Sequence, residues 1–266
     1  MSIPLFLKNI KNNTLLLLVF VALMSIYLAV IIYIYDPSGV GAMVDMMSIL
    51  PTALVNAMGF GTIDSGLTGF IASLFYGFLI YLFPMVYCII LANRLVAKWV
   101  YEGSFTSLLC TPNSRIKIIV TQGIYLLASI VVLFTVLFLV GYGMSEQFFP
   151  GMLEVKVFLK LNIGACLMTM TIAMFCFFFS CLFNSTKLAL FFGALVPVGF
   201  FILNTLSKLS ERTAFLGKFS LYNAFDGLAI VNGQANITLI IGGFAIFIGV
   251  LFVAAVGVFS LKRLPV

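Results

Sequence analysis

Hydrophobic and polar positions divide this chain into six long apolar runs. The runs cover about residues 15–35, 67–92, 118–141, 161–183, 188–206 and 237–261. Each run is close in length to the ~20 apolar residues with which a helix crosses a bilayer. The alternating strands of ~10 residues that build a membrane barrel do not occur. The pattern predicts an all-α, polytopic membrane protein with six transmembrane helices, in one transmembrane domain that covers residues 1–266.

The composition supports this interpretation. Hydrophobic residues make up 63% of the chain and charged residues only 8%, and 29 residues are phenylalanine. Soluble domains carry about 25% charged residues. A chain of 266 residues cannot hide so much apolar surface from water, so we expect lipid to surround most of it.

The net charge of +6 is spread over the ends of the apolar runs, where basic residues orient a membrane protein. With a cytoplasmic N-terminus, the outer segments hold five basic and seven acidic residues. The inner segments hold nine basic residues and one acid, namely Lys8, Lys11, Arg94, Lys98, Arg115, Lys117, Lys187, Lys262, Arg263 and Glu102. This bias predicts a multi-pass protein of the plasma membrane with both termini in the cytoplasm. It argues against a nucleic-acid partner.

Two segments outside the runs have a mixed polarity. Residues 3–13 combine apolar residues with Lys8 and Lys11, which favours a helix that lies in the inner membrane interface. The alternative is a frayed basic flank that only sets topology. Residues 207–236 combine apolar residues with Asn223 and Asp226, which favours short helices that dip into the outer leaflet.

The second run has two further features. Pro84 lies inside it and is interpreted as a passive bend. The apolar stretch Val40–Phe60 precedes it, and we expect there a short outer interfacial helix or an extension of the second span. A complete extra span would place the basic residues between runs two and three on the outer side.

Missing residues exclude several kinds of chemistry. The chain has no histidine and no GxxxxGK[ST] motif, so it has neither His-ligated metal sites nor a P-loop for ATP. No Asp, Glu, Lys or Arg lies near the middle of a run, where ion-coupled carriers place such residues. The five cysteines lack zinc-ligand spacing and are interpreted as packing residues. We therefore expect no catalytic or metal site, and an energy source outside this chain.

The longest inner segment connects the second and third runs, from Arg94 to Ile118. Ser104 is a helix N-cap residue type, and Pro112 disfavours helix in the residue before it. The pattern predicts a short helix between two spans on the inner side, with its polar face open to a partner. An ordinary inner loop with topological charges is the alternative.

The sequence EGSFTSLLCTPNSR, from Glu102 to Arg115, resembles the segment after the second span in type-2 ABC exporter permeases. The residues that fit are Glu102, Gly103, Ser104, Leu108, Leu109, Thr111, Pro112, Ser114 and Arg115. The order of elements is similar too: an amphipathic lead-in, six spans, and a long outer segment before the last span.

The resemblance implies a permease domain that forms a dimer, most simply a homodimer, and binds two separate ATPase subunits that hold ATP and Mg. It implies a coupling helix over residues 101–112, whose contact residues would be Glu102, Gly103, Ser104, Phe105, Leu108, Leu109, Thr111, Pro112 and Arg115. It also implies a re-entrant hairpin over 207–236 as the outer gate, with Leu221, Tyr222, Phe225 and Asp226.

The cargo expected from the apolar spans is hydrophobic or amphipathic. An amphipathic antimicrobial peptide or toxin is favoured, a drug or antibiotic is next, and lipid-linked cargo follows. The conduit would lie at the dimer interface, between spans one, two and five. Two other classes of protein stay open: a channel or secondary carrier that works alone, and a membrane scaffold that transports nothing.

Overall fold

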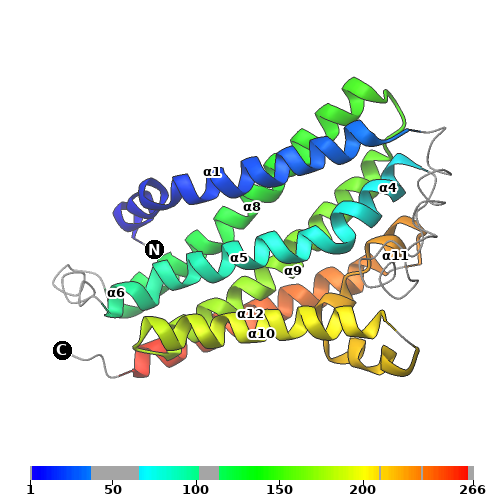
Figure 1. The fold of residues 1–266 in the computed structure, drawn as a ribbon. Coiled ribbons are helices and arrows are strands. Elements are labelled where there is room, and N and C mark those ends of the chain that lie inside the picture. The colour runs from blue at the N-terminus through cyan, green and yellow to red at the C-terminus, as the bar shows by residue number, and fades with distance from the viewer. Residues whose placement is uncertain (1, 37–65, 102–113, 210, 235, 263–266) are drawn as a thin grey trace.

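The computed structural model describes residues 2–36, 66–101, 114–209, 211–234 and 236–262 (Figure 1). Six helical spans in these ranges are long and apolar enough to cross a membrane. They are α1 (Ile3–Ile34), the run from α4 to α6 (Leu67–Tyr101), α8 (Arg115–Phe148), α9 (Val155–Leu182), α10 (Thr186–Ser207) and α12 (Ile237–Leu261). The described residues form no strand. The predicted all-α fold with six candidate membrane spans is therefore confirmed, and it fits a multi-pass membrane protein.

Successive spans run in opposite directions, so α1 begins and α12 ends at the same end of the bundle (Figure 1). We call it the basic end, because its described charged residues are Lys8, Lys11, Arg94, Lys98, Arg115, Lys117, Lys187 and Lys262. The opposite end carries both signs, and we call it the hairpin end after the predicted outer hairpin at residues 207–236. This separation matches the charge pattern of the sequence, and the assignment of the basic end to the cytoplasm stays a prediction.

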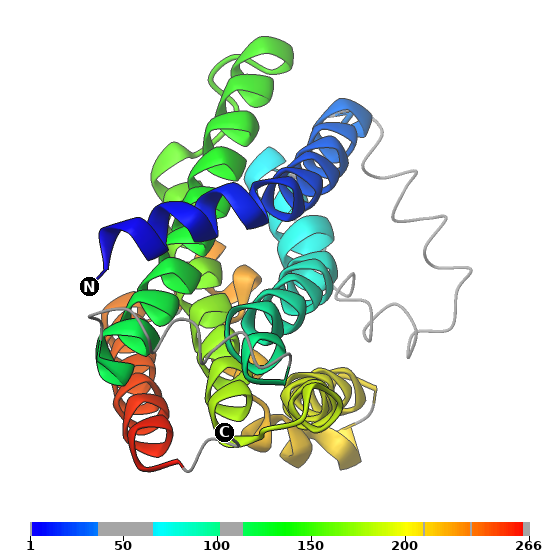
Figure 2. The ribbon, with the colours of Figure 1, turned by 90° about the vertical axis from the view of Figure 1, so that its left-hand side faces the viewer.

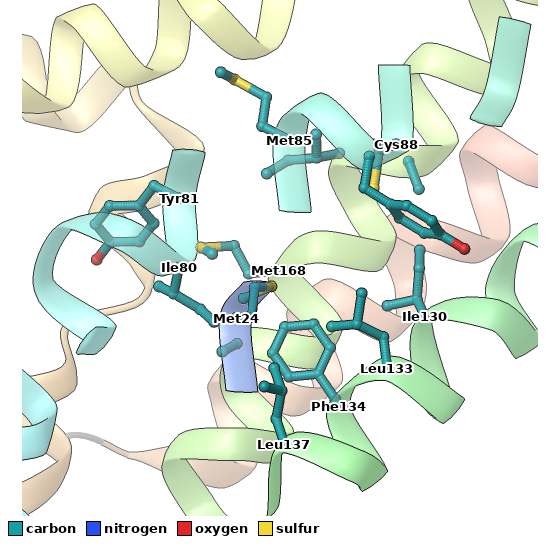
Figure 3. Packing of buried hydrophobic residues seen from close by; sticks show 14 of the residues in the cluster. Met24, Ile80, Tyr81, Met85, Cys88, Ile130, Leu133, Phe134, Leu137 and Met168 are labelled. Atoms are coloured by element: carbon teal, nitrogen blue, oxygen red, sulfur yellow. The ribbon is translucent and has the colours of Figure 1, made fainter. Parts of the chain in front are cut away.

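The most buried span is α9, which packs against α5, α8, α10 and α12. Its inward face meets side chains from three other spans in one hydrophobic core (Figure 3). Met24 of α1, Phe134 of α8 and Met168 of α9 lie together there, beside residues of α5. The outer helices α1, α10 and α12 bury much less of their apolar surface inside the chain.

The N-terminal residues 3–13 are helical, but they do not form a helix separate from the first span. They are continuous with it in α1, and Figure 2 shows the first turns lying across the bundle before the helix turns to run along it. Asn13 and Thr14 donate side-chain hydrogen bonds to the carbonyls of Asn9 and Ile10, four residues earlier. A bond from a Ser or Thr hydroxyl to the carbonyl four residues earlier, as Thr14 makes, often bends a helix.

The second span contains two π-helical segments. It consists of α4 (Leu67–Leu74), η1 (Phe75–Leu79), α5 (Ile80–Ala92), η2 (Asn93–Ala97) and α6 (Lys98–Tyr101). Pro84 lies inside α5, and η1 ends five residues before it. The irregularity of this span is thus more than a proline bend, and π turns are frequent at functional positions.

The spans α8, α9 and α10 begin three, six and two residues before their apolar runs, because helical hydrogen bonding continues into the polar flanks, whereas α12 matches its run at both ends. α8 begins at Arg115 and continues to Phe148, whose ring contacts that of Tyr33 with centroids 5.6 Å apart. Ser114 caps its start by accepting a hydrogen bond from the backbone N–H of Lys117. The predicted interfacial stretch Val40–Phe60 lies outside the described residues.

Candidate functional site

The segment between α10 and α12 folds into three short helices at the hairpin end. They are the 3₁₀ helices η3 (Glu211–Phe219) and η4 (Leu221–Ala224), and the α-helix α11 (Gly227–Val231). Polar residues cap two of them. The Ser220 hydroxyl accepts the backbone N–H of Tyr222, and the Asp226 carboxylate accepts those of Leu228 and Ala229 at 3.0 and 3.3 Å. These caps replace missing helical partners and fix the turn between η4 and α11.

Two of the predicted gate residues are buried inside the bundle. Tyr222 is fully buried and Phe225 is 1% exposed. The ring of Tyr222 lies edge-on against that of Tyr81 on α5, with centroids 4.9 Å apart. The Tyr81 hydroxyl donates a hydrogen bond of 3.1 Å to the carbonyl oxygen of Phe225. One tyrosine of the second span therefore holds both aromatic residues of the hairpin.

Residues 220–225 contact α5 and α10 partway along these helices. Tyr81 is 14 residues from Leu67, where the second span begins, which corresponds to ~20 Å along the helix. The Ser220 hydroxyl donates a 2.7 Å hydrogen bond to the carbonyl of Phe200. Phe200 is seven residues before the end of α10, or ~10 Å along that helix.

A second layer of residues fixes the ring of Phe225. It lies over Gly164 of α9, where an added Cβ would come within 2.8 Å of the ring. It also packs near Tyr76 of η1, with ring centroids 6.4 Å apart. The Tyr76 hydroxyl accepts a 3.2 Å hydrogen bond from the side chain of Asn162. Because only a hydrogen atom stands at position 164, the hairpin can lie directly on α9.

The other two predicted gate residues lie at the edge of this packing. Asp226 is exposed and caps α11. Leu221 borders an apolar groove between η4 and α12. The other lining residues are Ala224 of η4 and Leu239, Ile240, Gly243, Phe244 and Phe247 of α12. The four residues thus have different surroundings, and only Tyr222 and Phe225 belong to one aromatic cluster.

Lys208, directly after α10, places its ammonium beside this cluster. Its Nζ lies 5.9 Å from the centroid of the Tyr81 ring, a cation–π geometry. Burial lowers the pKa of Lys208, and the Asp226 carboxylate opposes this shift. The site thus combines aromatic rings with one partly desolvated cation. Among the described residues, no three His, Cys, Asp or Glu side chains are placed to hold a metal ion.

The predicted ATPase-coupling residues from Glu102 to Pro112 lie outside the described residues. Arg115 is described, and it begins α8 at the basic end. Its Nη1 donates a 3.4 Å hydrogen bond to the carbonyl of Lys262, directly after α12. The Lys262 ammonium donates to the carbonyls of Cys181 and Phe183 at 2.8 and 2.7 Å.

We call this set of contacts the basic-end clamp. It joins the first turn of α8 and the last residues of α12 to the carbonyl end of α9. The last carbonyls of a helix have no partner within it, and a cation there is favoured by the helix dipole. Burial lowers the pKa of Lys262 to about 8.

Sequence patterns alone missed the partners of the hairpin: Tyr76, Tyr81, Asn162, Gly164 and Lys208. Of these, only Asn162 carries a local signal, since a polar amide inside an apolar run needs a hydrogen-bonding partner. The aromatic residues and the glycine are ordinary residues of membrane helices. A scan against protein-family models and a search of curated proteins each find no match to this chain.

Proposed function

We propose that this chain is the transmembrane permease subunit of an ATP-driven ABC exporter, powered by a separate ATPase subunit. The observation that carries the proposal is the segment Glu102–Arg115, which resembles the coupling segment of type-2 ABC permeases. It connects the second span, which ends with α6, to α8, at the end that holds eight described basic residues and no described acid. A partner that binds this segment could therefore move both spans directly.

The basic-end clamp supports a route for that action. Arg115 is the first residue of α8 and the last residue in the resemblance. Through Lys262 it is tied to the end of α9, and α9 carries Gly164 beneath the hairpin. A movement of the coupling segment would thus shift α8, α9 and α12 together, as a rigid-body transition requires.

The hairpin is proposed as the gate at the opposite end. Its residues Tyr222 and Phe225 fill the space between α5, α9 and α10. They contact these helices ~10–20 Å along the helix axis from the hairpin end. A re-entrant hairpin at this depth is supported by the hydrogen bond from Tyr81 to the Phe225 carbonyl. Opening it would break that bond and withdraw two aromatic rings.

The cargo is proposed to be hydrophobic or amphipathic, with an amphipathic peptide favoured over a drug. No Asp, Glu, Lys or Arg lies near the middle of a span, which argues against ion coupling and against a charged binding site for inorganic ions. The same absence supports an external source of energy. Two copies of the chain are proposed to form the conduit between them.

The proposal is tested with the Glu102→Lys and Leu108→Arg variants. Each should abolish ATP-dependent export of a fluorescent amphipathic peptide from cells while the protein still inserts, and each should lose the copurifying ATPase. Glu146→Lys is the matched control, because it reverses an exposed acid at the hairpin end and should keep export. Normal export by both coupling variants would overturn the assignment.

The two other classes of protein have their own signatures. Peptide flux through vesicles that contain only this purified chain, without ATP, would identify a stand-alone channel or carrier. A scaffold would show no peptide flux under any condition, and neither coupling variant would change its behaviour.

A further inference from the structure

A groove between α8 and α9 lies outside the clamp and the proposed conduit, and among its lining residues Asn162 is the one already placed beside the hairpin. It has a volume of about 380 Å³ and is lined by Val131, Phe134, Thr135 and Phe138 of α8 and by Leu159, Asn162, Ile163, Cys166, Leu167 and Met170 of α9. Val131, Leu159 and Ile163 at its rim are 40–47% exposed. In a membrane-spanning bundle, an apolar rim of this kind faces acyl chains.

One polar side chain faces this apolar groove with unused hydrogen-bonding capacity. Asn162 is only 6% exposed, and within the described ranges its side chain makes one hydrogen bond, from Nδ2 to the Tyr76 hydroxyl. A side-chain amide has two N–H donors and a carbonyl acceptor. The Thr135 hydroxyl, in contrast, is satisfied by the Val131 carbonyl of its own helix at 2.7 Å.

The depth of Asn162 matches a particular part of the lipid. α9 has 28 residues and is ~42 Å long, so it extends ~6 Å beyond each side of a ~30 Å hydrocarbon layer when centred in it. Asn162 is seven residues, or ~10 Å, from the start of α9. It therefore lies ~4 Å inside the boundary, close to the ester groups of a glycerolipid.

We propose that this groove is a binding site for one glycerolipid of the leaflet on the hairpin side. An ester carbonyl of the lipid accepts a hydrogen bond from the free N–H of Asn162. One acyl chain runs from there along Ile163, Cys166, Leu167 and Met170 toward the midplane. A peptide fits less well, because its backbone N–H and C=O groups would lack partners in so apolar a groove.

The site does not depend on the proposed transport function, since it follows from the membrane-spanning fold and the groove alone. It does adjoin the hairpin: Asn162 bonds Tyr76, and Tyr76 packs on Phe225. A bound lipid would therefore hold the Asn162 amide, which bonds the Tyr76 hydroxyl, and so would help to fix the ring against which Phe225 packs.

The test uses photo-crosslinking to phosphatidylcholine that carries a diazirine in one acyl chain, in ester-linked and ether-linked forms. Each probe is mixed into phosphatidylcholine vesicles with the full chain, and the labelled residues are mapped by mass spectrometry. We expect labels concentrated on residues 131–138 and 159–170. The ester form should label the groove about fivefold more than the ether form, because the ether lacks the carbonyl and one hydrogen bond contributes about 1 kcal/mol.

Three variants separate the outcomes. Asn162→Leu should remove the preference for the ester probe. Ile163→Trp, at the exposed rim, should reduce labelling by both probes about tenfold without disturbing Tyr76. Val253→Trp is the matched control, since Val253 is a 71% exposed apolar residue of α12, and it should label as the native chain does. Labels spread evenly over all exposed spans, or an ester preference that survives in Asn162→Leu, would overturn the proposal.

Discussion

At the scale of single residues, the Tyr81 hydroxyl joins the second span to the segment between α10 and α12. It supplies a hydrogen bond to the carbonyl of Phe225 in a place that water does not reach. A buried carbonyl without its donor costs about 1–3 kcal/mol. The hairpin should therefore be sensitive to the loss of one oxygen atom.

Tyr81→Phe keeps the ring and removes this donor. We expect the purified protein to lose about 1–3 kcal/mol of stability and the hairpin to open more often. A cysteine placed at Ile230 of α11, which is 4% exposed, should then react faster with a maleimide. Tyr33→Phe is the control, because Tyr33 is 70% exposed. Equal reaction rates in the native chain and Tyr81→Phe would show that the bond does not hold the hairpin.

Sequence reasoning reached Tyr222 and Phe225 only through the family resemblance, and it could not give their partners. Tyr81 is 144 positions from Phe225, and neither residue differs in type from the many aromatic residues around it. Which of these rings meet depends on how the helices rotate and cross, and that is set by packing of the whole bundle. Gly164 illustrates the same limit, because a glycine in an apolar run does not reveal which ring needs its space.

At the scale of elements, the apolar runs predicted all six spans because burial in lipid requires long uninterrupted apolar helices. The ends were less accurate. α1 continues through the N-terminal turns without a break although these turns are polar and basic, and the π segments of the second span have no hydropathy signal. Hydropathy registers the membrane environment and not local hydrogen bonding.

The first turns of α1 are docked by polar contacts, which gives a second prediction. The Asn9 side chain donates to the Gln122 side chain of α8 at 2.6 Å, and both residues are buried. Asn9→Leu should release these turns and speed amide hydrogen exchange over residues 3–13. Asn12→Leu makes the same change at an exposed position and should leave exchange unchanged. Slow exchange in both variants would mean that the apolar contacts of these turns suffice.

The basic-end clamp gives a prediction about pH. Lys262 has a folded-state pKa of about 8, lowered by burial from 10.5. Between these values the unfolded chain binds more protons than the folded chain, so stability rises with pH. The stability of the native chain relative to Lys262→Met should therefore increase from pH 8 to pH 10 and stay level between pH 6 and pH 7.

Thermal unfolding of the purified native chain and Lys262→Met at each pH measures this difference. Lys187→Met removes an exposed lysine from the same end and reports the general effect of losing a basic residue. If the stability of the native chain relative to Lys262→Met falls as pH rises, the assigned burial of the ammonium is wrong.

At the scale of the whole molecule, the least buried spans indicate where further contacts belong. α10 presents an apolar stripe at helical spacing: Leu188, Phe191, Leu195, Gly199 and Ile202. A Cβ at Gly199 would meet nothing within 4 Å, whereas Gly193 on another face is packed against Cys176 of α9. The small residues of this span thus serve two interfaces, one inside the chain and one still open.

The open stripe gives the last prediction, which rests on the proposed homodimer. A second copy can approach closely at Gly199, because small residues allow helix backbones to come near each other. Leu195→Cys, at a position 51% exposed, should form a disulfide-linked dimer when membranes are oxidised. Ile246→Cys on α12, 71% exposed, should stay monomeric, since α12 lies outside the interface expected between spans one, two and five. Because the four described native cysteines are largely buried, the native chain is the baseline for both. If Ile246→Cys cross-links and Leu195→Cys does not, then α10 does not line the interface between the two copies, and the proposed arrangement of the homodimer is wrong.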